Sequence, residues 1–253
     1  MKIFDPDPSR RWQFVFTHPD DELAIAAWMR RLVQAGAKVF AVWSVAIPVR
    51  EQEARATMRK IGVPDEHLTF FRFPDGSACD YLQPISGAMR DLFAATAPTD
   101  LVVPAFECGH LDHDSTHFAA CGAAPSGIRI AEYPLYYTYL TRFPILNRFA
   151  DPAGEQRIEL TAEEVALKST LSRNYPSQNI RSLLIWYAAA GWLRIRPRDL
   201  VRAERLRPKT VQDYLKPNLP ADLAGRVMRC EKWKRWERCV RAAVSCSQCE
   251  ETS

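Results

Sequence analysis

Two short polar segments hold most of the residues in this chain that could do chemistry. Residues 18–22 read His-Pro-Asp-Asp-Glu, and residues 109–117 read Gly-His-Leu-Asp-His-Asp-Ser-Thr-His. Four of the five histidines of the 253-residue chain lie in these segments. Imidazole nitrogens and carboxylate oxygens are common ligands of zinc and related divalent metals. The two segments therefore predict a metal site.

A single metal could use ligands from both segments. Two adjacent carboxylates repel each other, and a cation or a shared proton relieves that repulsion. One His and one Asp from residues 18–22, with one His from residues 109–117, leave a coordination position for water, as a catalytic zinc requires. The second carboxylate is then available as a base. The alternative is that Asp20 or Asp21 only accepts the first free amide hydrogens of a helix.

The elements around the two segments follow from the spacing of apolar residues. Short apolar runs rich in β-forming residues alternate with stretches of helical spacing, which is typical of βαβ units and a parallel sheet. The predicted strands are residues 12–17, 39–45, 68–73, 101–104 and 128–133. The predicted helices are residues 23–35, 51–61, 81–95, 113–121 and 162–173. Each polar segment follows a strand, so both should lie beyond the carboxyl edge of the sheet.

We therefore expect an α/β fold, a Rossmann-like three-layer sandwich with a mostly parallel sheet. Residues 1–180 should form the catalytic domain, and residues 181–253 a basic helical C-terminal extension packed on or near it. Residues 194–241 hold 15 Lys and Arg against 6 Asp and Glu. Such a region can attract phosphate, nucleic acid or an anionic membrane surface, but it is more often the solvated face of a packed helix. We expect an amphipathic helix over residues 226–244 to pack on the α/β part.

The composition is that of an ordinary soluble protein, with 47% hydrophobic and 25% charged residues. The longest uncharged apolar runs, residues 39–49 and 183–193, are too short to cross a bilayer as helices. The first ten residues lack the pattern of a secretory signal, so a cytoplasmic location is expected. Seven cysteines in a chain of this length fit free thiols. A four-Cys zinc site is the less favoured interpretation of the last four, Cys230, Cys239, Cys246 and Cys249.

The two polar segments resemble the signature motifs of the LmbE-like (PIG-L) family of zinc-dependent N-acetylglucosamine deacetylases. Weaker matches follow in the order found in the family. They are Arg50-x-x-Glu53, Phe73-Pro-Asp-Gly76, Lys168 and Tyr175-x-Ser177-Gln178. The resemblance extends over about residues 12–207 and implies that residues 1–180 are an LmbE-like catalytic domain.

The resemblance implies a role for each residue of the two motifs. The implied zinc ligands are His18, Asp21 and His113. The implied catalytic residues are Asp20 as general base, His110 as the group that stabilises the oxyanion or protonates the leaving amine, and Asp112, which orients a neighbouring imidazole. His117 could support the ligand His113 from one helical turn away, but a core or capping role is at least as well supported. We assign no role to His67.

The implied substrate is a small-molecule amino-sugar conjugate. Arg50 and Asp75 match positions that hold hydroxyls of the N-acetylglucosamine ring in the family, although an Arg–carboxylate pair could equally be a structural salt bridge. The implied reaction is hydrolysis of a linear amide to a free amine and acetate, with Zn²⁺ as cofactor and no nucleic-acid partner. The basic C-terminal region offers an option for peripheral membrane contact, and the sequence leaves the oligomeric state open.

Two departures from the family bear on the substrate. The helix after the first motif lacks the usual glycines, and residues 44–49 lack the usual Thr and Gly. A smaller or more apolar entrance to the site would result. The main alternative function is therefore a metal-dependent hydratase or lyase on the same scaffold. A non-catalytic binding module and an iron oxygenase are less favoured, because every motif residue is present and such oxygenases usually have all-β scaffolds.

Overall fold

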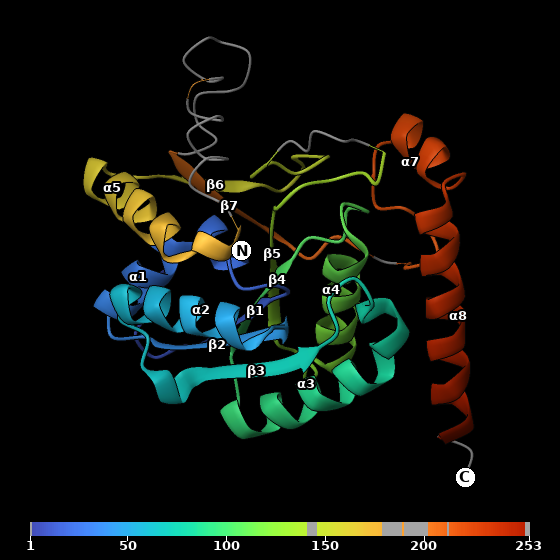
Figure 1. The fold of residues 1–253 in the computed structure, drawn as a ribbon, viewed down its shortest axis with the longest axis horizontal. Coiled ribbons are helices and arrows are strands. Elements are labelled where there is room, and N and C mark those ends of the chain that lie inside the picture. The colour runs from blue at the N-terminus through green and yellow to red at the C-terminus, as the bar shows by residue number, and fades with distance from the viewer. Residues whose placement is uncertain (1, 141–145, 179–188, 190–201, 212, 251–253) are drawn as a thin grey trace.

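The fold is seen in a computed structural model, which describes residues 2–140, 146–178, 189, 202–211 and 213–250 (Figure 1). Seven strands of the described residues form one sheet in the order β3-β2-β1-β4-β5-β7-β6. Their bounds are β1 Arg11–Phe16, β2 Lys38–Val45, β3 Leu68–Phe73, β4 Asp100–Pro104, β5 Arg129–Tyr133, β6 Gln156–Glu159 and β7 Ala203–Pro208. The first five strands are parallel, and β7 is antiparallel to β5 and β6. The expected mostly parallel α/β sheet is confirmed.

Helices cover both faces of this sheet (Figure 1). One layer contains α1 Ala26–Gln34, α2 Pro48–Ile61 and α5 Ala162–Leu171, and the other contains α3 Leu82–Thr96 and α4 Leu111–Ala123. Two further helices follow, α7 Ala221–Val227 and α8 Glu231–Glu250, and α8 packs against α3 and α4. No helix of the described residues combines the length and low polarity of a membrane span.

Alternation along β1 explains why the sheet needs two helical layers. Phe14 and Phe16 contribute to a core that also contains Trp28 of α1, whereas Val15 contributes to a second core with Met89 of α3. Because successive side chains of a strand point to opposite faces, the buried apolar run Phe14–Phe16 must be covered on both sides. This run at the end of β1 thus favours the three-layer arrangement.

The C-terminal part packs on the α/β part and completes its sheet. Trp233 and Trp236 of α8 are 2% and 0% exposed, in a core that includes Phe106. This matches the expected packing of a basic helix, but residues 226–244 fall in two helices, α7 and α8. The expected helical C-terminal part is present, and it also supplies a strand that was not expected, β7, which pairs with two other strands of the sheet. The division after residue 180 stays a prediction, and the run 183–193 lies outside the described residues.

The predicted helix 23–35 begins later than expected. A 3-10 turn, Asp21–Ala24, comes first, and α1 starts at Ala26. The two carboxylate oxygens of Glu204 in β7 accept hydrogen bonds from the backbone N–H groups of Ala27 and Trp28, at 2.9 and 2.8 Å. Lys168 Nζ lies 2.9 Å from the same carboxylate. A cap from 177 residues away in the sequence has no local signal, so the start of α1 could not be predicted from neighbouring residues.

Candidate metal centre

The two polar segments meet at one edge of the sheet. Residues 18–22 follow β1 and residues 109–117 follow β4, and these strands are parallel neighbours. The chain proceeds outward from β1 to β2 and β3 on one side, and from β4 to β5 on the other. Ligand sites in doubly wound sheets lie beyond the strand ends at such a switch point. The topology therefore brings the two segments together, as their sequence positions predicted.

Three imidazole rings lie close together, and two of them are beside the carboxylate of Asp21. The ring centroids of His18, His110 and His113 lie 5.3–5.6 Å apart. Asp21 Oδ2 is 3.6 Å from His113 Nε2 and 3.9 Å from His18 Nδ1. One ligand atom from each of His18, Asp21 and His113 lies within 4.8 Å of the others. The three residues expected to hold a metal therefore lie close enough to bind one ion if their side chains move slightly closer together.

The backbone directs the two adjacent aspartates to different partners. Asp20 has a φ of 123°, a conformation that is strained for a residue with a Cβ. Asp20 Oδ1 lies 3.2 Å from Arg50 Nη2. Asp21 Oδ2 instead accepts hydrogen bonds from the N–H groups of Thr17 and His18, at 3.2 and 2.8 Å. Asp21 therefore lies beside the imidazoles, whereas Asp20 contacts Arg50 and could serve as a base.

Glu22 holds the strained turn, a role that the sequence did not reveal. Its side chain is fully buried, and Oε2 accepts hydrogen bonds from the Asp20 N–H at 2.9 Å and from Trp43 Nε1 at 3.2 Å. The Tyr175 hydroxyl donates to Oε1. Glu53 binds the same distant segment, since its carboxylate accepts from the N–H and Oγ of Ser177, at 3.1 and 2.6 Å. The two weak motifs that include Glu53, and Tyr175 with Ser177, were the sequence signals for these contacts.

The electrostatics of the cluster fit a divalent cation. Burial and the neighbouring Asp21 charge raise the pKa of Asp20 to about 8. Burial lowers the pKa of His18, but Asp112, Asp75 and Asp21 outweigh it and raise that pKa to about 10. Without a metal, a protonated His18 thus supplies the positive charge that these carboxylates would otherwise receive from a bound cation. Burial keeps the pKa of His113 well below its usual value, which favours the neutral form that binds metals.

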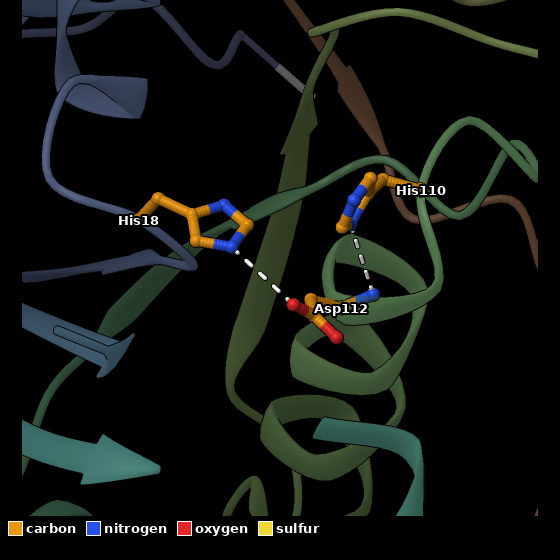
Figure 2. A group of neighbouring side chains, drawn as sticks. All are labelled: His18, His110 and Asp112. Atoms are coloured by element: carbon orange, nitrogen blue, oxygen red, sulfur yellow. Dashed lines mark hydrogen bonds and ion pairs between the residues drawn. The ribbon is translucent and has the colours of Figure 1, made fainter. Parts of the chain in front are cut away.

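Asp112 lies between His18 and His110 at the start of α4 (Figure 2). Its Oδ2 atom is 3.4 Å from His18 Nε2, and its backbone N–H donates to His110 Nδ1 at 3.2 Å. Its carboxylate also accepts hydrogen bonds from the N–H groups of Gly76 and Ala78, at 2.7 and 3.0 Å. Asp112 therefore connects both imidazoles to the loop after β3 that carries Asp75.

Arg50 and Asp75 both reach the cluster. The Arg50 side chain is 9% exposed, and its Nη2 donates to the Pro19 carbonyl at 2.9 Å. Its Nη1 lies 3.7 Å from Asp75 Oδ2, and Asp75 Oδ1 lies 3.2 Å from His18 Nε2. The Asp75 side chain is 58% exposed. The salt bridge considered for this pair is therefore present, and the accessible carboxylate can also meet a ligand.

The other two histidines do not join the cluster. His117 is fully buried and its Nδ1 atom lies 2.7 Å from the Pro104 carbonyl oxygen, which supports the core interpretation. His67 packs against Phe40, with ring centroids 4.4 Å apart, and its Nδ1 lies 3.0 Å from the Val39 carbonyl oxygen. The structure gives neither residue a contact with the metal-ligand candidates.

A pocket of about 310 Å³ opens beside His110. It is lined by Gly76, His110, Leu111, Glu231, Lys232 and Arg235. Its wall therefore combines the loop after β3, the start of α4 and the first turns of α8. The C-terminal helix borders the candidate site, which the sequence did not indicate.

Tyr136, in the loop after β5, is a further neighbour that the sequence did not identify. Its ring centroid lies 5.1 Å from that of His113. Its backbone passes so close to Gly109 that a Cβ at this glycine would lie 1.9 Å from the Tyr136 carbonyl oxygen. Gly109 thus permits a close approach between the two loops that flank His113.

Replacing Gly109 by Ala should therefore displace one of these loops. We expect a loss of about 1–3 kcal/mol in the free energy of unfolding, as in other overpacked sites, together with weaker metal binding. Urea unfolding and metal content measure the two effects. Gly122→Ala in α4 is the control, because its added Cβ meets no heavy atom within 4 Å other than its chain neighbours and the backbone of its own helix. It should be neutral or stabilise the helix by up to about 1 kcal/mol. Equal behaviour of the two variants would contradict the proposed crowding.

Both polar segments lie in a part of the chain that matches a known protein family. Residues 13–124 match the sequence profile of the PIG-L family, described as GlcNAc-PI de-N-acetylase. This match includes both motifs on which the resemblance rested. No curated protein sequence matches the chain.

Solved structures share the fold at low sequence identity. A zinc-inhibited form of teicoplanin deacetylase Orf2 has a TM-score of 0.61 at 16% identity, covering 80% of this chain and 99% of that one. The N,N'-diacetylchitobiose deacetylase from Pyrococcus horikoshii has a TM-score of 0.55 at 15% identity, covering 82% and 88%. GalB, the 4-carboxy-2-hydroxymuconate hydratase of Pseudomonas putida, has a TM-score of 0.50 at 12% identity, covering 80% and 98%. The fold thus occurs with more than one chemistry, and function must be argued from the site.

Proposed function

We propose that this chain, which carries a PIG-L (LmbE-like) domain, is a zinc-dependent hydrolase that removes the acetyl group from an N-acetylglucosamine-type amino sugar or its conjugate. The proposal is carried by one observation: three candidate metal ligands converge at one point, and the neighbouring carboxylate has a different partner. His18, Asp21 and His113 converge within 4.8 Å, while the adjacent Asp20 contacts Arg50 instead. An amide hydrolase with one metal needs such a ligand set beside a separate base.

His18, Asp21 and His113 would hold the zinc ion. When bound, zinc supplies a Lewis acid that polarises the amide carbonyl and lowers the pKa of water. The residues fit this group because two imidazoles and one carboxylate leave a position for water. Neutralisation by the cation would also favour the charged forms of Asp20 and Asp21, whose pKa values burial raises.

Asp20 would accept the proton of the attacking water. Arg50 Nη2, 3.2 Å from Asp20 Oδ1, favours the ionised carboxylate and fixes its orientation. The hydrogen bond from Asp20 N–H to Glu22 keeps the strained turn in place before substrate arrives. A base held in this way needs little reorganisation during the reaction.

His110 would donate a hydrogen bond to the substrate. Its Nδ1 atom accepts from the Asp112 N–H, so a neutral ring carries its proton on Nε2. Burial lowers the pKa of His110, which favours this neutral form in the free protein. The Nε2–H group can stabilise the developing oxyanion or move toward the leaving nitrogen.

Arg50 and Asp75 would recognise sugar hydroxyls. Arg50 Nε is buried and makes no hydrogen bond to the residues that the structure describes, and Asp75 is the more accessible partner. A site built to bind a hydroxyl rejects an analogue without it, because its own polar groups are then left unpaired. We expect at least one mono-deoxy analogue to lose more than about 100-fold in kcat/KM.

Asp75→Ala should remove most of that discrimination. The control is Asp91→Ala, which changes an exposed aspartate on α3. It should discriminate among the deoxy analogues as the unaltered enzyme does. Full discrimination by Asp75→Ala would exclude this residue from sugar recognition.

The test of the proposed reaction is the stoichiometry of its products. Protein restored with zinc after chelation should release one acetate and one free amine per N-acetylglucosamine conjugate consumed. The chelated protein should release neither. A hydratase would consume an unsaturated acid without releasing acetate. Turnover of such an acid, with no acetate from any conjugate tested, would favour the hydratase alternative and overturn the proposal.

A further inference from the structure

A second group of metal-ligating side chains lies where α8 meets the turn before α3. Cys79 and Asp80 belong to the 3-10 turn Ala78–Tyr81, and Cys239 lies in α8. One ligand atom from each lies within 4.8 Å of the others. None of the three belongs to the candidate centre at His18, Asp21 and His113. We propose that Cys79, Asp80 and Cys239 form a second zinc site that fastens α8 to the α/β part.

Two of the three distances within this group already match a tetrahedral zinc site. Cys79 Sγ and Cys239 Sγ each lie 3.6 Å from Asp80 Oδ1. Bonds of about 2.3 Å to sulfur and about 2.1 Å to oxygen, at a tetrahedral angle, also separate the two ligand atoms by roughly 3.6 Å. These two separations can therefore stay as they are when an ion binds. A water molecule would complete the four ligands.

The charges of the group balance around a divalent ion. Two thiolates and one carboxylate carry three negative charges, which zinc and the guanidinium of Arg235 neutralise. Arg235 Nη2 lies 2.7 Å from Asp80 Oδ2, the oxygen that does not face the sulfur atoms. Carboxylates that bind metals are commonly held in this way by an outer hydrogen bond. Arg235 thus leaves Oδ1 for the metal.

The three ligands differ in how deeply they are buried, which leaves one side of the group open to solvent. Cys79 is 2% exposed, whereas the Asp80 side chain is 52% exposed and Cys239 is partly exposed. The exposed side gives an ion access, and the buried side contributes a thiol within the core around Trp233 and Val240. Without metal, burial raises the pKa values of both thiols, so each would release its proton to solvent as it binds zinc.

The position of the site suggests its effect. The first turns of α8 supply Glu231, Lys232 and Arg235 to the pocket beside His110. A zinc ion at Cys239 would fix α8 against the turn that follows the Asp75 loop. The second site would therefore maintain the outer wall of the pocket without taking part in the reaction.

Cobalt distinguishes the two sites, because only the second contains sulfur. Reduced, metal-free protein titrated with Co²⁺ should show an ultraviolet thiolate-to-cobalt charge-transfer band. Zinc-loaded protein should contain two zinc ions per chain. Cys239→Ser and Asp80→Asn should each lose the band or weaken cobalt binding at least tenfold, and zinc content should fall toward one. Retention of the other ion would show that these variants remain folded.

Two controls test whether the band belongs to this group. The double variant Cys246→Ser/Cys249→Ser removes the closely spaced pair near the end of α8 and should keep the band. Cys121→Ser removes a thiol of α4 that lies 3.4 Å from His117 Nε2, and it should also keep the band.

Three results would overturn the second site. One is a single zinc ion per chain with no charge-transfer band. Another is a band that survives in Cys239→Ser. The third is a Cys79–Cys239 disulfide in protein purified without reductant, seen as a mass lower by two hydrogens, that rebinds no zinc after reduction. None of these readouts depends on acetate release, so the proposed hydrolase activity stands or fails separately.

Discussion

Asp20→Asn is expected to keep the fold and the full metal content while losing about two to four powers of ten in kcat, the usual effect of removing a general base. The substitution preserves the size of the side chain and an oxygen that can accept from Arg50, which lies 3.2 Å from Asp20 Oδ1. It removes the negative charge and with it the ability to take a proton at neutral pH. Steady-state acetate release and elemental analysis of the same sample measure the two quantities.

Asp21→Asn is the matched control, since it makes the same change one residue away. Asp21 Oδ2 lies 3.6 Å from His113 Nε2 and accepts two backbone N–H groups, so its charge should matter for metal affinity. We expect weaker zinc binding, with activity partly restored by excess zinc. If Asp20→Asn were almost fully active, or if it lost zinc while Asp21→Asn did not, the assigned roles would be wrong.

His113→Ala is expected to lose one zinc ion per chain and all measurable acetate release. His113 is 3% exposed, and burial holds its pKa well below the usual value, so the native ring is a neutral ligand. Its removal leaves one imidazole and one carboxylate, too few to retain zinc in a site that also binds water. Elemental analysis checks the metal, and circular dichroism checks that the fold persists.

His67→Ala provides the histidine control. His67 packs against Phe40 outside the cluster, so this variant should keep its metal and its activity. Unchanged zinc content in His113→Ala would mean that other residues hold the metal.

The sequence predicted those parts of the fold that depend on local pattern. The strand expected at residues 68–73 has the same bounds as β3, because an apolar run ends there at a turn containing Asp75 and Gly76. The meeting of the two polar segments also followed from pattern, since parallel strands end at one edge of a sheet.

Contacts between distant segments could not be predicted in this way. The cap that Glu204 provides for α1, the contact between Tyr175 and Glu22, and the pairing of Cys239 with the turn at Cys79 each join residues far apart in the chain. The strained backbone at Asp20 could not be predicted from the sequence for a related reason. A positive φ at a residue other than glycine depends on its surroundings, here the acceptor that Glu22 offers to the Asp20 N–H.

The central claim is that His18, Asp21 and His113 hold the ion on which the proposed hydrolase activity depends. Diffraction from crystals of active, zinc-loaded protein, measured on both sides of the zinc absorption edge, tests it most directly. We predict an anomalous peak within about 2.0–2.2 Å of one atom from each of the three residues, with Asp20 outside the ligand set. An active crystal with no zinc peak at these residues, or with Asp20 as a ligand in place of Asp21, would contradict the account.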